Sequence, residues 1–103
     1  MDEAKTVAAL AALGHEIRLK IFRLLVRAGP EGLNIGEIAG HLDLAPSTLA
    51  HHLASLKQAG LVSQEKRGRE VRTVAEAPRL QAVMSFVMEN CCVGVAAPEP
   101  LKG

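Results

Sequence analysis

The sequence predicts a mainly α-helical domain that carries one small β-hairpin. Apolar residues recur at a helical spacing of about 3.6 over most of the chain, and the spacing changes to about 2 between Val62 and Ala75. With 103 residues, of which 49% are hydrophobic, the chain is long enough for one domain with a modest core. We expect a folded unit over residues 1–92 and a flexible tail over residues 93–103, a stretch that contains Gly and Pro.

Two helices are expected at the start of the chain. Residues 2–13 are rich in Ala, and Gly14 ends this first helix. Residues 15–28 form an amphipathic helix that stops before Gly29 and Pro30. The first helix is expected to pack along the side formed by Val7, Leu10 and Ala11, and the second along Ile17, Ile21, Leu24 and Leu25.

A pair of short helices follows. Asn34 is a suitable N-cap, and Glu37 completes a capping box with it. Residues 43–45 form a brief turn, after which Pro46 begins a helix that Gly60 ends. The buried positions are expected to be Ile35, Ile38, Ala39 and Leu42 in the first of these helices, and Leu49, Leu53 and Leu56 in the second. Two short helices joined by such a turn form a helix-turn-helix.

The last third of the chain predicts a hairpin and a final helix. Val62–Lys66 and Val71–Ala75 read as strands joined by residues 67–70, and Pro78 opens the helix. One face of that helix carries Leu80, Val83, Met84, Val87, Met88 and Cys91. A hairpin after a helix-turn-helix is a wing, so the predicted fold is a winged helix-turn-helix. The apolar faces of the first and last helices remain uncovered, which predicts a twofold homodimer through them.

The distribution of charge favours a nucleic-acid partner. The whole chain has a net charge of +1, but residues 47–79 carry six basic and three acidic side chains. The positive charge therefore lies on the second helix of the helix-turn-helix and on the wing. We find no signal peptide and no membrane-length apolar stretch, so we expect a cytoplasmic protein that does not bind membranes.

One polar face of the helix that Pro46 begins is the candidate reader of DNA sequence. Its small polar side chains can reach base edges in the major groove. The alternative is a merely solvated face, but the preceding helix and the basic hairpin favour DNA. His52 lies nearer the buried side, where packing is its expected role. The candidate base-reading residues are Ser47, Thr48, His51, Ser55 and Gln58.

Basic residues of the hairpin are the candidate contacts to the DNA backbone. Lys66, Arg67 and Arg69, together with Arg72, suit phosphate or minor-groove binding. A charged hairpin tip can also protect an exposed strand edge from aggregation, and the two roles are compatible.

The order of elements and two motifs resemble the ArsR/SmtB family of winged-helix regulators, from Ala8 to Cys92. "LGHEIRLKIFRLL" (Leu13 to Leu25) is similar to the family's opening motif, and "GEIAGHLDLAPSTLAHHLASLKQAGLV" (Gly36 to Val62) to its helix-turn-helix. The resemblance implies a dimeric repressor that holds double-stranded operator DNA until an inducer releases it. The chain has no Cys-x-x-Cys and no catalytic triad, so an enzyme such as a thiol reductase is not expected, and a pure protein-interaction module would leave the basic wing unexplained.

The only two cysteines, Cys91 and Cys92, are adjacent and cannot cross-link distant parts of the fold. A thiolate pair selects soft ions, and zinc is disfavoured because no nearby His or acidic cluster completes four ligands. The pair resembles that of arsenical-responsive family members, although the third cysteine of some is missing here. This resemblance implies that trivalent arsenic, as arsenite or methylarsenite, binds Cys91 and Cys92 as inducer, and no cofactor is expected. A thiol redox switch and ordinary packing of Cys91 remain alternatives.

Overall fold

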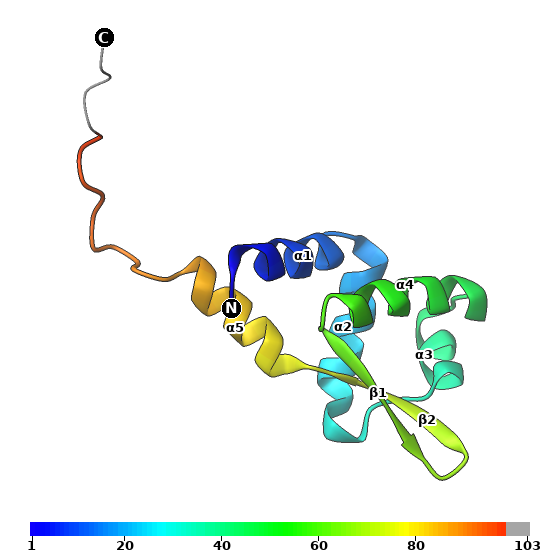
Figure 1. The fold of residues 1–103 in the computed structure, drawn as a ribbon. Helices are drawn as coiled ribbons and strands as arrows, with labels where there is room; N and C mark the ends of the chain where they lie inside the picture. Colours follow the sequence, from blue (N-terminus) through cyan, green and yellow to red (C-terminus); the bar gives the residue numbers. More distant parts are fainter. Residues whose placement is uncertain (99–103) are drawn as a thin grey trace.

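The computed structural model describes residues 1–98 and has the predicted winged helix-turn-helix fold (Figure 1). Over these residues the chain forms five α-helices, one short 3₁₀ turn and one antiparallel hairpin. In chain order the elements are α1 (Glu3–Leu13), α2 (Glu16–Ala28), η1 (Gly29–Glu31), α3 (Ile35–Leu42), α4 (Pro46–Gln58), β1 (Val62–Arg67), β2 (Glu70–Ala75) and α5 (Ala77–Val87). No helix among the described residues is both long and apolar enough to cross a membrane.

One hydrophobic core lies between the helices and the base of the hairpin. It contains Ala9, Ala12, Ile21, Phe22, Leu25, Ile38, Leu49, Leu53, Leu56, Leu61, Val62 and Val83. The leucine stripe predicted for α4 is buried as expected. Phe22 was missed, because it lies beside the aliphatic stripe of α2 rather than within it. Each fully buried Leu or Ile side chain contributes about 1.5–3 kcal/mol to folding, so this core holds α4 firmly against α2.

The helix-turn-helix forms where the sequence signals predict it. The Asn34 side chain accepts a hydrogen bond from the Glu37 amide, and the Glu37 carboxylate accepts one from the Asn34 amide, completing the capping box. Asp43 ends α3 in a left-handed conformation, and Pro46 occupies the first turn of α4. Only residues 43–45 separate the two helices, so the direction of α4 is fixed by a short turn.

The wing projects from the body of the domain at the lower right of Figure 1. Its strands are one residue longer at the tip than predicted, because Arg67 pairs with Glu70 and leaves only Gly68 and Arg69 in the turn. A backbone bridge between Leu33 and Thr73, with N···O distances of 3.0 and 2.8 Å, ties the base of the hairpin to the segment before α3. The wing is therefore held in a set position relative to the helix-turn-helix.

Helices α1 and α5 pack against each other and differ from expectation in two ways (Figure 1). Helix α1 buries Thr6, Ala9 and Ala12 within the chain, whereas the side predicted to pack, with Val7 and Leu10, is exposed. Helix α5 ends at Val87, so the prediction that Cys91 continues its apolar face was wrong. Residues 93–98 are exposed and have no helix or strand, and the rest of the predicted tail lies outside the described residues.

Candidate nucleic-acid interface

The outward face of α4 carries the predicted base-reading residues. Leu49, His52, Leu53 and Leu56 are buried on the opposite face. Ser47, Thr48, His51 and Gln58 are exposed, and Ser55 is half-buried. Because the buried leucines fix the rotation of α4 about its axis, this polar face points to solvent. Its contact with DNA remains a prediction.

Two alanines complete this face. They were not predicted from the sequence, because the candidate base readers were polar residues. Ala50 and Ala54 are exposed between Ser47 and Gln58. Small side chains allow the helix backbone to approach a groove closely, and Ala can contact the methyl group of thymine. A pattern of small residues along an outward helix face is the signal that would have found them.

The two ends of the face differ in their surroundings. Ser55 and Gln58 line a shallow hollow of about 390 Å³ together with Ala8, Ala11 and Arg18 of the first two helices. The N-terminal end of α4, with Ser47 and His51, is free of this hollow. Since recognition helices present their N-terminal residues to base edges, Ser47 and His51 are better placed as base readers than Ser55 and Gln58.

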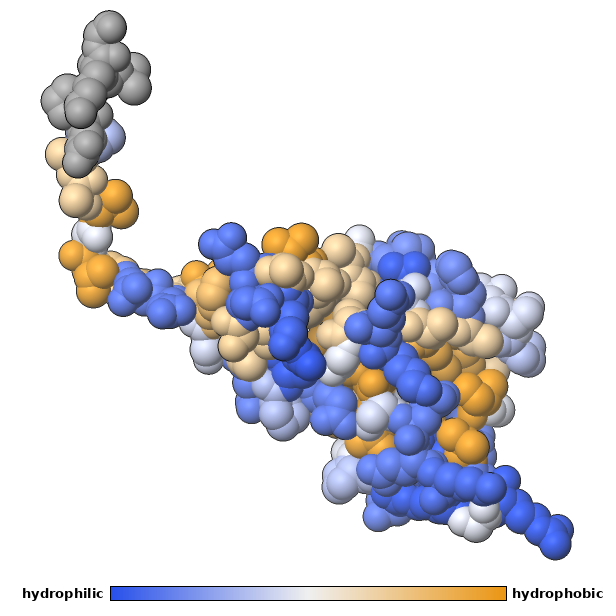
Figure 2. Space-filling view, viewed as in Figure 1, coloured by the Kyte–Doolittle hydropathy of each residue, from blue (hydrophilic) through white to orange (hydrophobic). Residues whose placement is uncertain are grey.

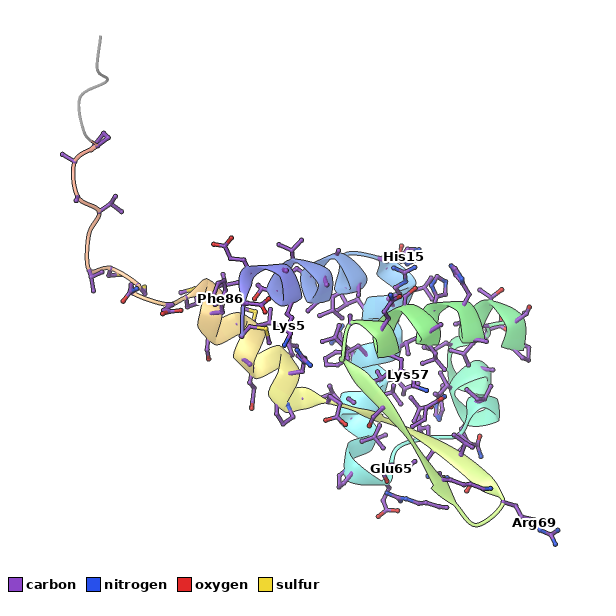
Figure 3. The ribbon with its side chains drawn as sticks, in the orientation of Figure 1. Lys5, His15, Lys57, Glu65, Arg69 and Phe86 are labelled. Atoms are coloured by element: carbon purple, nitrogen blue, oxygen red, sulfur yellow. The ribbon has the colours of Figure 1, made fainter. Side chains whose placement is uncertain are left out.

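His52 anchors the buried side of α4 to α2, as its expected packing role requires. Its Nδ1 accepts a hydrogen bond of 3.3 Å from Arg18 Nε, and its ring lies 4.8 Å from that of His15 and 5.5 Å from that of His51. Figure 3 shows His15 where α1 meets α2, beside α4. Burial lowers the pKa of His52, and the charges of His15, Arg18 and His51 lower it further. The neutral ring is therefore the form that fits this position.

This arrangement predicts a fall in stability at acidic pH. In the unfolded chain His52 takes up a proton near its usual pKa of 6.5, whereas the folded chain resists it. The contribution of neutral His52 to the free energy of unfolding is fully present above that pH and is lost as the pH falls below it. Urea unfolding at pH 7.5 and 5.5 should show the loss, and His52→Gln, which can still accept from Arg18, should reduce it. His41→Gln is the matched control and should keep the pH dependence of stability of the original protein. If His52→Gln also keeps it, His52 is not the group responsible.

The cations of the wing are not equivalent. Arg67 turns back to η1 and pairs with Glu31 at 3.0 Å and Glu65 at 2.9 Å, and these carboxylates raise its pKa. Arg69 points away from the hairpin tip (Figure 3). Among residues 1–98, neither Lys66 nor Arg69 makes an ion pair. Lys66 and Arg69 can therefore bind phosphate directly, whereas Arg67 would first have to break its ion pairs with Glu31 and Glu65.

Arg72 is a structural clamp, and its predicted contact with DNA is not supported by its position. Its side chain is only 19% exposed and pairs with Glu37 at 3.2 Å and Glu70 at 3.3 Å. It also donates hydrogen bonds of 3.0 Å to the backbone carbonyls of Glu31 and Gly32. Sequence could not reveal these partners, which lie about 35–41 residues earlier for three of the four contacts.

Loss of this clamp should destabilise the protein. Arg72→Ala removes the donor to the partly buried Gly32 carbonyl and to the Glu31 carbonyl, together with the ion pairs to Glu37 and Glu70, so we expect the free energy of unfolding to fall by about 2 kcal/mol. Arg69→Ala at the exposed tip should leave it unchanged, since isolated surface charges contribute little. Thermal unfolding of both variants measures the difference in stability. If the two variants are equally stable, the contacts of Arg72 contribute nothing to folding.

The cysteine pair lies in turns that follow α5. Asn90 and Cys92 both adopt left-handed backbone conformations, with φ of 61° and 67°. In a regular helix adjacent side chains diverge by about 100°, but here the Sγ atoms of Cys91 and Cys92 lie 3.0 Å apart. Both residues are exposed, and the hydrogen bond between the Cys91 and Cys92 side chains raises the pKa of Cys91, as does desolvation. Two thiols on one side of the chain can hold one soft atom between them.

Comparison with known proteins agrees with the fold and the helix-turn-helix. The sequence profile of a helix-turn-helix domain family matches residues 13–65. The chain is 31% identical over 91 residues to the transcriptional activator HlyU of Vibrio cholerae, covering 88% of this chain and 82% of HlyU. It is 43% identical over 63 residues to a putative arsenical resistance operon repressor, ArsR, of Halobacterium salinarum, covering 61% of this chain and 48% of that protein. An ArsR-like regulator from Rhodococcus sp. RHA1 superimposes with a TM-score of 0.74 at 30% identity, over 82% of this chain and 76% of that one.

The fold, the outward face of α4 and the projecting wing define a winged-helix regulator of transcription that binds DNA. More particularly, the chain belongs to the ArsR/SmtB family. Members of this family are DNA-binding regulators and not enzymes, in agreement with the sequence.

Proposed function

We propose that the protein is a homodimeric repressor that leaves its operator when a trivalent arsenical binds Cys91 and Cys92. The observation that carries the proposal is the pair of exposed thiols with sulfur atoms 3.0 Å apart at the end of α5. The similarity to a putative arsenical resistance repressor supports it. The similarity to HlyU, which is named as an activator, makes the direction of regulation the first point to test.

The chemistry of capture balances without a redox step. Methylarsenite, as CH₃As(OH)₂, exchanges both hydroxyls for the two sulfurs, so two As–O bonds break and two As–S bonds form. The two thiol protons leave with the hydroxyls as water, and arsenic stays trivalent. Among residues 1–98, no three His, Cys, Asp or Glu side chains gather in a metal-binding group. Inorganic arsenite would therefore keep a hydroxyl or take an added thiol as its third ligand.

Dimerisation through α1 and α5 is part of the proposal. One chain leaves an apolar surface on these helices, in which Val7 is 64% exposed, Met84 49% and Val87 51%. Figure 2 shows apolar colour mixed with hydrophilic colour over this part of the molecule, whereas the wing is mainly hydrophilic. A second copy would cover the surface and set two α4 helices on successive major grooves.

A route from α5 to α4 supports coupling between inducer and DNA. The Glu76 amide donates to the Leu61 carbonyl at 2.8 Å, directly after α4. The Arg79 guanidinium lies so close to Gly60 that a Cβ there would meet Nη2 at 2.8 Å. A shift of α5 would therefore move the C-terminal end of α4. Couplings of this kind are commonly about 1–3 kcal/mol.

The pH dependence of inducer binding tests the thiol chemistry. Arsenical capture releases water and no net protons, so its affinity should be nearly constant between pH 6 and 8. Cadmium displaces two protons from the thiols, so its affinity should rise up to about a hundredfold per pH unit. Fluorescence anisotropy of bound DNA measures both, and Cys92→Ser should abolish release by methylarsenite. Release that persists in Cys92→Ser, or that follows the cadmium pattern, would overturn the proposal.

A thiol redox switch is the second candidate, because exposed sulfurs 3.0 Å apart can also be oxidised. A disulfide between adjacent residues is strained, which favours the arsenical. If the redox function holds, mild peroxide should remove the two thiol hydrogens, which mass spectrometry would detect as a loss of two hydrogens. The same treatment should release DNA from the protein.

A further inference from the structure

A group of exposed cations outside the wing lies on α2. Lys20, Arg23 and Arg27 project from one side of this helix, and all three are exposed. With His41 they line a hollow of about 270 Å³ where α2 meets α3. Over residues 1–98 the sole ion pair in this row joins Lys20 to Glu16 at 3.2 Å, and both side chains are mostly exposed. An exposed pair of this kind is weak and exchanges easily for another carboxylate.

This cationic row faces away from the DNA-reading helix. Arg18 of α2 points to α4, because its Nε donates to His52. At about 3.6 residues per turn, Arg27 lies half a turn around α2 from Arg18, and Arg23 nearly as far. DNA held by α4 would therefore leave the cationic row free to bind something else.

An apolar border runs beside the cationic row. Leu19 is 43% exposed and Val26 is 47% exposed, and both neighbour Arg23 on the helix surface, four residues before it and three after it. Beyond Val26 an apolar groove of about 620 Å³ continues between α2 and α5, lined by Phe22, Leu80 and Met84. A phosphate backbone gains nothing from such a border, whereas a protein partner would bury it.

We infer that this face of α2 binds an acidic, amphipathic protein segment, whose carboxylates pair with the cationic row and whose apolar side chains cover Leu19 and Val26. The charge and hydrophobicity of the surface match a helix with acidic residues next to a leucine stripe. Since α4 faces the other way, the regulator would hold this segment and DNA at once. The inference does not depend on which inducer the cysteines bind.

Binding of a designed peptide tests the inference. The probe is a short fluorescent peptide of Leu, Ala and Glu with amphipathic spacing, added to the 103-residue chain already bound to a DNA duplex selected from a random library. We expect saturable binding, and Arg23→Gln with Arg27→Gln should weaken it about tenfold, as two exposed ion pairs would. Arg23→Lys with Arg27→Lys, which keeps both positive charges and leaves the DNA-binding residues intact, is the matched control and should leave peptide affinity nearly unchanged.

Three results would overturn the inference. The peptide could fail to bind, or bind the α2 variant as tightly as the original. A peptide of the same composition with scrambled spacing could bind equally, which would show unspecific charge attraction. A second labelled duplex could bind the preformed complex and be lost from the α2 variant, which would make the row a nucleic-acid surface. DNA binding by α4 is measured separately in the same samples, so a failure here is distinguishable from failure of the proposed function.

Discussion

Val87→Glu should convert the protein to a monomer and lower its affinity for operator DNA about a hundredfold or more. Val87 is 51% exposed in the single chain, so the change costs the folded monomer little. In the proposed dimer it would bury one unpaired carboxylate from each subunit in an apolar interface, which is strongly unfavourable. A monomer holds one half-site and loses the gain from two linked contacts, commonly a factor of about 10²–10⁴. Sedimentation and DNA-binding titrations measure the two effects.

Leu19→Glu is the matched control for this prediction. It places the same charge on a similarly exposed apolar residue of α2, outside α1 and α5. It should leave the dimer intact. If Val87→Glu stays dimeric while it remains folded by circular dichroism, the proposed interface is wrong.

Lys66→Ala with Arg69→Ala should weaken binding to every DNA sequence and flatten its dependence on salt. These are the two wing cations without an ion pair among residues 1–98, and the dimer would present four of them. Each phosphate contact contributes a slope of about −0.9 in a plot of log affinity against log salt, so loss of four should reduce its magnitude by about 3.6. His51→Ala should instead change the preferred sequence and leave the slope nearly unchanged.

Arg67→Ala tests whether existing ion pairs reduce the contribution of a wing cation to DNA binding, or whether all wing cations contribute equally. Arg67 is already paired with Glu31 and Glu65, so its removal should change the salt slope less than removal of Arg69. An effect of Arg67→Ala equal to that of Arg69→Ala would mean that Arg67 leaves its carboxylates on DNA.

Local signals in the sequence predicted most of the fold. The Asn34 and Glu37 capping box, Pro46 and the leucines of α4 each act within one or two helical turns, so the sequence contains all that is needed to read them. The same signals fixed which face of α4 would be outward. The change of period after Gly60 gave the wing, with an error of one residue at each side of its tip.

Contacts between distant residues could not be read in this way. Nothing near Arg72 or Arg67 indicates that Glu31 and Glu37 will neutralise them, because η1 and α3 approach the wing only in the folded chain. The end of α5 was misplaced because Met88 and Cys91 continue an apolar spacing, whereas the helix ends at Val87 and the backbone is left-handed at Asn90. Asn tolerates a left-handed conformation better than most residues, so Asn90 was the signal in the sequence that the helix would not continue.

The most direct test of the account is a map of backbone amide signals by nuclear magnetic resonance, recorded as a selected DNA duplex is added to the dimer. We predict that the largest changes fall on the amides of the first half of α4, from Ser47 to Ala54, and on residues 66–69 of the wing. The cationic row of α2 should change little. A map in which α4 stays unaffected while α2 or α5 responds would contradict the claim that α4 reads DNA.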